Sequence, residues 1–81
     1  MDIARNPKQL GNLISRARKQ NGWNQTVLGQ KAGVGQDTIS LIETGNPARL
    51  DTILSVLAAL DLEIRIGPRT KGQASDIEDI F

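Results

Sequence analysis

The sequence of 81 residues predicts a small, mainly α-helical domain: a bundle of four or five helices followed by one β-strand. Apolar residues recur at helical spacing in four stretches, and a glycine-bearing turn separates the two shortest of these. Strict alternation of apolar and charged residues follows the last stretch. The expected order is an N-terminal arm over 1–6, a helical bundle over 7–60, a dimerisation strand over 61–68 and a flexible acidic tail over 69–81.

The first helix is expected to begin at the asparagine-proline pair of residues 6–7. Asparagine is a good N-cap, and proline suits the first helical position. Leu10, Ile14 and Ala17 then recur at the i, i+4, i+7 spacing of one helix face. The helix is expected to end near residue 20, because an asparagine-glycine pair follows as a stop signal.

Two short helices, expected over 25–32 and 36–44, form a helix-turn-helix pattern. The inward-facing and turn positions of this pattern are Leu28, Gly29, Gly33, Val34, Ile39 and Ile42, with Val34 expected as a buried plug. Glycine inside a helix costs about 1 kcal/mol relative to alanine. Gly29 therefore indicates that the second helix crosses close to the first. An ordinary helical hairpin without a role in DNA binding is the alternative reading of these spacings.

A fourth helix is expected over 50–60, where the apolar residues form a wide stripe. These residues are Leu50, Ile53, Leu54, Leu57 and Leu60. The period then changes to two, and Leu62, Ile64 and Ile66 alternate with charged residues as in a strand. A lone strand cannot satisfy its own backbone, so we expect antiparallel pairing with the same strand of a second copy. Packing on its own bundle and pairing with the N-terminal arm are the alternatives.

Composition excludes several classes of function. The chain contains no cysteine and no histidine, which removes thiolate metal sites and the commonest metal ligand and general base, so we expect no metal, no cofactor and no enzymatic activity. The sequence has no apolar run of ~18 residues and no signal-peptide pattern at the N-terminus. We therefore expect no membrane association and a cytoplasmic, nucleoid-associated location.

The charge is unevenly distributed along the chain. Residues 1–49 carry seven basic and three acidic residues, whereas residues 50–81 carry three basic and six acidic residues. The positive part contains the helix-turn-helix pattern, as suits a protein that binds a polyanion. The candidate residues for phosphate attraction are Lys8, Arg16, Lys19 and Lys31.

Residues 10–60 resemble the Xre/Cro/lambda-repressor family of helix-turn-helix domains. The residues at the family's fixed positions are Gln25, Leu28, Gly29, Gly33, Val34, Ile39 and Ile42. The resemblance implies a lambda-repressor-like bundle in which Arg18 and Glu43 form a buried ion pair. It also implies DNA contacts from Asn24 and Gln25 to phosphate and from Gln36, Asp37, Thr38 and Ser40 in the major groove. Gln36 is the best base reader of the set, because its amide can pair with N6 and N7 of adenine.

A narrower resemblance covers nearly the whole chain. The run RKQNGWNQTVLGQKAGVGQDTISLIE, the helix ending in AALDLEIRI and the short tail closing on an aromatic residue are similar to antitoxins of the HipB family. The resemblance implies a homodimer that binds double-stranded operator DNA, sequesters a HipA-like serine/threonine kinase toxin and represses its own operon. A plain Xre-type regulator without a toxin partner and a helical interaction module that does not bind DNA remain as alternatives. For the tail over residues 69–81, binding to a partner and a purely solubilising role are both open.

Two residues depart from the pattern of the relatives. Gly35 stands where many of them carry a polar or basic residue, so a contact made there is absent in this chain. Asp37 introduces a carboxylate into the second helix of the motif, where it repels phosphate and best suits accepting a hydrogen bond from N4 of cytosine. We therefore expect the operator to differ from that of a relative.

Overall fold

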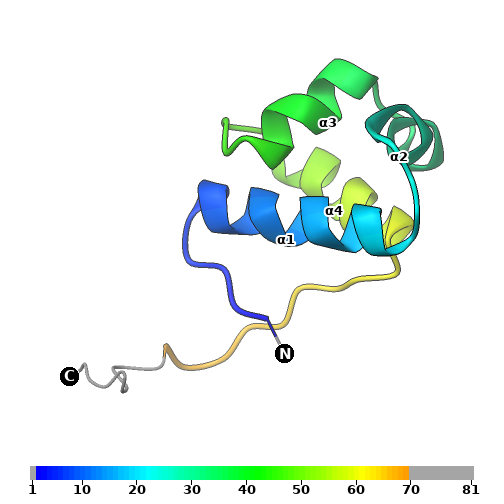
Figure 1. The fold of residues 1–81 in the computed structure, drawn as a ribbon. Helices are drawn as coiled ribbons and strands as arrows, with labels where there is room; N and C mark the ends of the chain where they lie inside the picture. Colours follow the sequence, from blue (N-terminus) through cyan, green and yellow to red (C-terminus); the bar gives the residue numbers. More distant parts are fainter. Residues whose placement is uncertain (1, 70–81) are drawn as a thin grey trace.

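The structure, a computed structural model, describes residues 2–69 and contains four α-helices in that part of the chain (Figure 1). The helices are α1 (Pro7–Gln20), α2 (Gln25–Ala32), α3 (Gln36–Glu43) and α4 (Leu50–Ala59). The predicted mainly helical helix-turn-helix bundle is confirmed. The predicted ends of the third and fourth helices were one residue too late, because the backbone at the C-cap residues Thr44 and Leu60 leaves the helical region.

The helix boundaries follow from local caps. The Oδ1 atom of Asn6 accepts a hydrogen bond from the backbone N–H of Gln9 at 2.8 Å, and that of Asn24 accepts one from Val27 at 2.8 Å. Gly33 ends α2 with a φ of 75°, in the left-handed region that favours glycine. These caps fix where α2 and the following turn lie, and so determine where α3 begins.

Eight apolar side chains, from the four helices and the C-cap residue of α4, form the core. They are Ile14, Leu28, Ile39, Ile42, Ile53, Val56, Leu57 and Leu60. Val34, which we expected to be buried, packs against this core but is only half-buried, as is Trp23. The turn thus covers the core without entering it.

Two glycines allow close approach of backbones. A Cβ atom at Gly11 in α1 would meet the carbonyl oxygens of Ile42 and, at 2.7 Å, Glu43 at the end of α3. A Cβ atom at Gly29 would lie 2.7 Å from the carbonyl oxygen of Val34 in the turn. The expectation that Gly29 marks a helix crossing is therefore corrected: Gly29 accommodates the turn that folds back on α2, and Gly11 marks the close crossing of α1 and α3.

The predicted apolar stripe of α4 is also corrected in part. Leu50 and Leu54 are 67% and 46% exposed, whereas Val56, absent from the predicted stripe, is fully buried. At 100° per residue, Val56 lies beside Ile53 and Leu60 on one side of the buried face, while Leu50 and Leu54 fall beyond Leu57 on the other side. The bundle therefore buries a narrower face of α4, turned towards α2, than the sequence pattern suggested.

Residues 62–69 continue from α4 as an extended chain beside the N-terminal arm (Figure 1). Within residues 2–69 the structure contains no strand, so strand pairing across a dimer stays a prediction. Leu62 and Ile64 are 42% and 48% exposed, and Ile66 is 97% exposed. The predicted tail lies outside the described residues from residue 70 onwards. None of the helices between residues 2 and 69 is both long enough and apolar enough to cross a membrane.

Candidate nucleic-acid interface

A series of hydrogen bonds connects a buried ion pair to the exposed first residue of α3. Arg18 donates from Nε to Oε2 of Glu43 at 2.6 Å and from Nη2 to Oε1 at 3.0 Å. Gln25 donates from Nε2 to Oε1 of Glu43 at 3.2 Å, and Gln36 donates from Nε2 to Oε1 of Gln25 at 2.7 Å. Side chains from α1, α2 and α3 thus meet in one polar network.

The ion pair at the inner end of this network is charged and well partnered. Burial by itself raises the pKa of Glu43, but the hydrogen bonds from Arg18, Gln25 and Ser15 and the positive charge of Arg18 outweigh it and lower the pKa below its ordinary value. The hydrogen bond to Glu43 raises the pKa of Arg18 against the opposing effect of burial. Arg18 also donates from Nη1 to the carbonyl oxygen of Trp23 at 2.8 Å, which ties the α1–α2 loop to the pair.

The structure brings Gln25 and Gln36 together at the first turns of α2 and α3. Gln36 is exposed and Gln25 is half-buried beneath it. Of the other predicted groove residues, Asp37 is exposed, and Thr38 and Ser40 are half-buried. Figure 1 shows α3 at the end of the bundle opposite to the C-terminal segment. The predicted DNA-contacting residues therefore share one end of the molecule, away from the predicted dimerisation segment.

Asn24 and Asp37 each have a local structural role. The Oδ1 atom of Asn24 accepts the capping hydrogen bond of α2, which leaves the donors of its amide NH₂ group to other acceptors. The Oδ1 atom of Asp37 accepts a hydrogen bond from the backbone N–H of Thr38 at 3.0 Å. A Cβ atom at Gly35 would lie 2.6 Å from this oxygen, so the glycine makes room for the carboxylate over the start of α3. Gly35 and Asp37, the two positions at which we expect a departure from the family pattern, thus lie side by side at the start of α3.

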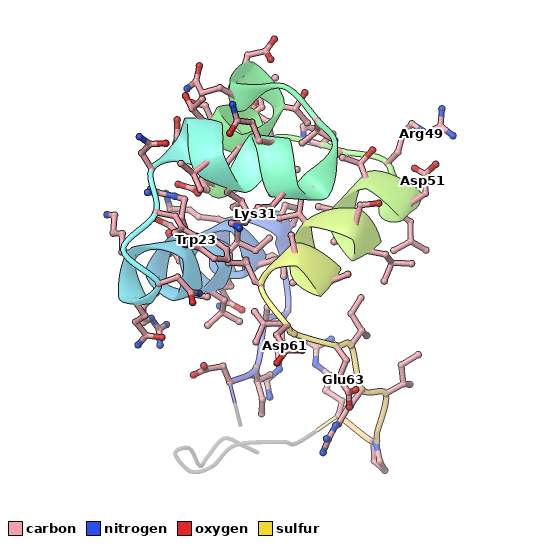
Figure 2. The ribbon with its side chains drawn as sticks, turned by 90° about the vertical axis from the view of Figure 1, so that its right-hand side faces the viewer. Trp23, Lys31, Arg49, Asp51, Asp61 and Glu63 are labelled. Atoms are coloured by element: carbon pink, nitrogen blue, oxygen red, sulfur yellow. The ribbon has the colours of Figure 1, made fainter. Side chains whose placement is uncertain are left out.

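Sequence reasoning missed several contacts, both at this end of the bundle and near the N-terminal arm. Nothing in the sequence pattern pointed to the hydrogen bond between Gln25 and Glu43. Lys31, a candidate for phosphate attraction, lies with its Nζ atom 4.8 Å from the centroid of the Trp23 ring, and Figure 2 shows the two side chains together. Arg16, another candidate, pairs with Asp2 at 3.5 Å. Two of the four candidate cations therefore have partners within the chain.

The geometry defines a helix-turn-helix domain: two short helices joined by a glycine turn, with a polar first turn on the second helix and a buried ion pair to α1. The family model described as helix-turn-helix matches residues 14–66. Antitoxin HipB of Escherichia coli strain K12 is 40% identical over 62 residues, which is 74% of this chain and 69% of that protein. The chain belongs to the helix-turn-helix family, and within it to the HipB antitoxins.

Solved structures agree with this assignment. The HipB chain in a structure described as a HipB-O4 20mer complex superposes with a TM-score of 0.79 at 32% identity, and the match covers 86% of this chain and 100% of that one. A structure described as a HipA-HipB-O2-O3 complex gives the same TM-score, identity and coverage. Antitoxin HipB of Escherichia coli O6:H1 is also 40% identical over 62 residues, which is 74% of this chain and 65% of that protein.

Proposed function

We propose that this chain is a sequence-specific DNA-binding repressor that acts as the antitoxin of a HipA-type kinase and represses its own operon as a dimer. The observation that carries the proposal is the placement of Gln36, exposed at the first turn of α3 and held there by Gln25. Its amide supplies the donor and acceptor that read adenine in the major groove. The match to HipB, which is found in complexes described as containing an O4 20mer or HipA, supports both partners.

In this proposal α3 enters the major groove, and the start of α2 lies against the DNA backbone. Asn24 and Gln25 bind phosphate, Gln36 reads adenine, and Asp37 accepts a hydrogen bond from cytosine. Thr38 and Ser40 contact bases or phosphates through their hydroxyl groups. Two copies related by a two-fold axis would read half-sites about one DNA turn, ~34 Å, apart.

The dimer is proposed to form at the opposite end of the bundle. An open, mainly apolar groove of about 960 Å³ lies between the N-terminal arm, α1, α4, the α3–α4 loop and residues 62–65, with Ile42 of α3 at its inner wall. Leu62 and Ile64 are among its lining residues. The backbone N–H of Leu62 donates to the carbonyl oxygen of Leu57 at 2.8 Å, and the backbone of residues 63–66 is proposed to pair with an antiparallel partner strand. Glu63 and Arg65 pair with each other at 2.7 Å in the single chain, and in the dimer each would face its mate in the partner strand.

The kinase is proposed to bind a surface other than the α2–α3 end, so that DNA and kinase can be bound at once. The description of a relative as a HipA-HipB-O2-O3 complex supports simultaneous binding. Neutralisation of the kinase would then be a matter of protein binding, since the chain contains no cysteine or histidine with which to build a common catalytic pair.

The test is a mobility-shift titration of the purified protein on a duplex that carries its own upstream region, over a salt series. The assay is run with and without the product of the adjacent kinase gene. Binding should fall steeply with salt, because each phosphate contact releases counterions, and adding the kinase should give a further shift. Binding without an effect of the kinase would identify a plain regulator. Failure to bind at low salt would leave a helical interaction module.

The first prediction concerns base reading by Gln36. Gln36→Ala should weaken binding to the cognate duplex by about 1–3 kcal/mol and leave binding to unrelated duplexes little changed. The matched control is Gln30→Ala, which removes another exposed glutamine from α2. The same loss on every duplex would exclude Gln36 from sequence readout.

A further inference from the structure

Glu43 lies too deep in the bundle to touch DNA, yet it is joined to the base-reading residue through one intermediate side chain. The residue is 9% exposed, and its Oε1 atom accepts the amide of Gln25, which in turn holds Gln36. We propose that Glu43 is a positioning residue for base reading: it fixes the orientation of the Gln25 amide, and so decides which hydrogen-bonding atoms Gln36 presents to the DNA. This inference rests on the proposed function.

The first step follows from the chemistry of the carboxylate. An ionised carboxylate only accepts hydrogen bonds, so Gln25 must turn its NH₂ group towards Glu43. Two hydrogen bonds from Arg18, at 2.6 and 3.0 Å, hold the carboxylate in place. The lowered pKa of Glu43 keeps it ionised at neutral pH. The Gln25 carbonyl therefore faces the opposite way, towards Gln36.

The second step transmits this orientation to the protein surface. Because the carbonyl oxygen of Gln25 only accepts, Gln36 must donate to it from Nε2, as it does at 2.7 Å. One N–H and the carbonyl oxygen of Gln36 then remain free. This donor and acceptor match N7 and the N6 amino group of adenine. If Gln25 were reversed, Gln36 would turn its carbonyl inwards and present two N–H donors, which match O6 and N7 of guanine.

A purely structural role for Glu43 makes a different prediction. If the ion pair only holds α1 against α3, its loss lowers the fraction of folded protein and weakens binding to all duplexes alike. The preference for adenine over guanine at the base pair read by Gln36 would not change. The quantity to measure is therefore this preference, not the affinity.

The experiment uses the full-length protein and a set of duplexes in which each position of the half-site is substituted in turn. The position read by Gln36 is the one at which Gln36→Ala loses discrimination. At that position the unmodified protein should prefer adenine, and Glu43→Gln should reduce the preference for adenine over guanine by about tenfold. Discrimination at the other positions should stay unchanged.

Gln25→Leu provides a second variant in case Glu43→Gln does not fold, because it leaves both members of the ion pair in place. It should relax the same preference, although loss of a phosphate contact lowers its affinity for every duplex. Gln30→Leu is the matched control, and circular dichroism checks folding. In the Gln25→Leu background, Glu43→Gln should have no further effect on the preference.

The outcomes separate this inference from the proposed function. Failure of the unmodified protein to discriminate among duplexes overturns both. Discrimination that persists unchanged in Gln25→Leu and Glu43→Gln overturns only the positioning role of Glu43. A preference for a base other than adenine overturns that role and the reading of adenine by Gln36, but leaves sequence-specific DNA binding in place. An equal loss of affinity for every duplex, with the base preferences unchanged, would show that Glu43 acts through stability alone.

Discussion

The two ends of the bundle differ in how their side chains find partners. At the α2–α3 end the buried charges of Arg18 and Glu43 are satisfied within the chain, by each other and by Gln25. At the other end Leu62 and Ile64 line an open apolar groove, and Ile66 is 97% exposed. The comparison teaches that one end satisfies its buried groups within the chain, whereas the other leaves apolar side chains exposed, where we propose that a second chain binds.

The largest effect on the free energy of unfolding should come from removing one member of the buried ion pair between Arg18 and Glu43. Arg18→Ala leaves Glu43 buried without its cation, so we expect the free energy of unfolding to fall by about 3–5 kcal/mol in urea denaturation. The control is Arg16→Ala, which removes an exposed arginine of the same helix that pairs with Asp2 at 3.5 Å. Its expected cost is below about 1 kcal/mol, as for other surface pairs. Equal costs for the two variants would contradict the special status of the buried pair.

Acidification should also lower the free energy of unfolding, by a smaller amount, because it protonates Glu43. Because the pKa of Glu43 is lower in the folded state, its ionisation stabilises the protein above the unfolded pKa of about 4.3, and this contribution is lost as the pH falls through the folded pKa. Urea denaturation between pH 7 and pH 2.5 should show a steeper loss for the unmodified protein than for Glu43→Gln. Parallel pH profiles would mean that Glu43 does not contribute to acid sensitivity.

A substitution in the C-terminal segment should have the smallest effect on the free energy of unfolding but a large effect on dimer formation. Ile64 is 48% exposed, so Ile64→Lys should change the helical signal of the bundle little but prevent strand pairing through charge and lost burial. Light scattering should report a single-chain mass for this variant. The control is Leu41→Lys, at an exposed leucine of α3, which should leave the dimer mass unchanged. A dimer that survives Ile64→Lys would refute the strand assignment.

Local signals in the sequence account for most of the fold. Asn6, Asn24 and Gly33 mark helix ends by short-range chemistry, and Ile39 and Ile42 mark a buried face by their spacing. These features depend on residues within a few positions of one another, so a single sequence is enough to predict them. The four helices follow directly.

Features that depend on how helices cross could not be predicted in the same way. Periodicity identifies an apolar stripe on α4 but not which edge of it meets α2, so Leu54 was expected inside and Val56 was overlooked. Gly11 stands out only when α3 is placed on α1. The strand expected at residues 62–66 would need a partner chain for its backbone hydrogen bonds, so it stays a prediction in a single chain.

In the candidate site, too, some residues could be predicted from the sequence, whereas the contacts between them could not. Resemblance to known domains pointed to Arg18, Glu43 and the residues of the α2 and α3 starts. The hydrogen bond from Gln25 to Glu43, at 3.2 Å, joins residues far apart in the sequence. It depends on side-chain orientations that cannot be predicted from residue spacing. The most informative contact of the site therefore came from the structure alone.

Hydroxyl-radical footprinting on the upstream duplex tests the central claim most directly, because it reports DNA reading and dimer geometry together. We predict two protected patches on one face of the DNA, about one helical turn apart, and loss of both patches for Ile64→Lys at concentrations where the unmodified protein binds. A single protected patch, or an unchanged pair of patches for Ile64→Lys, would contradict a repressor whose two α3 helices are held together by the C-terminal segments.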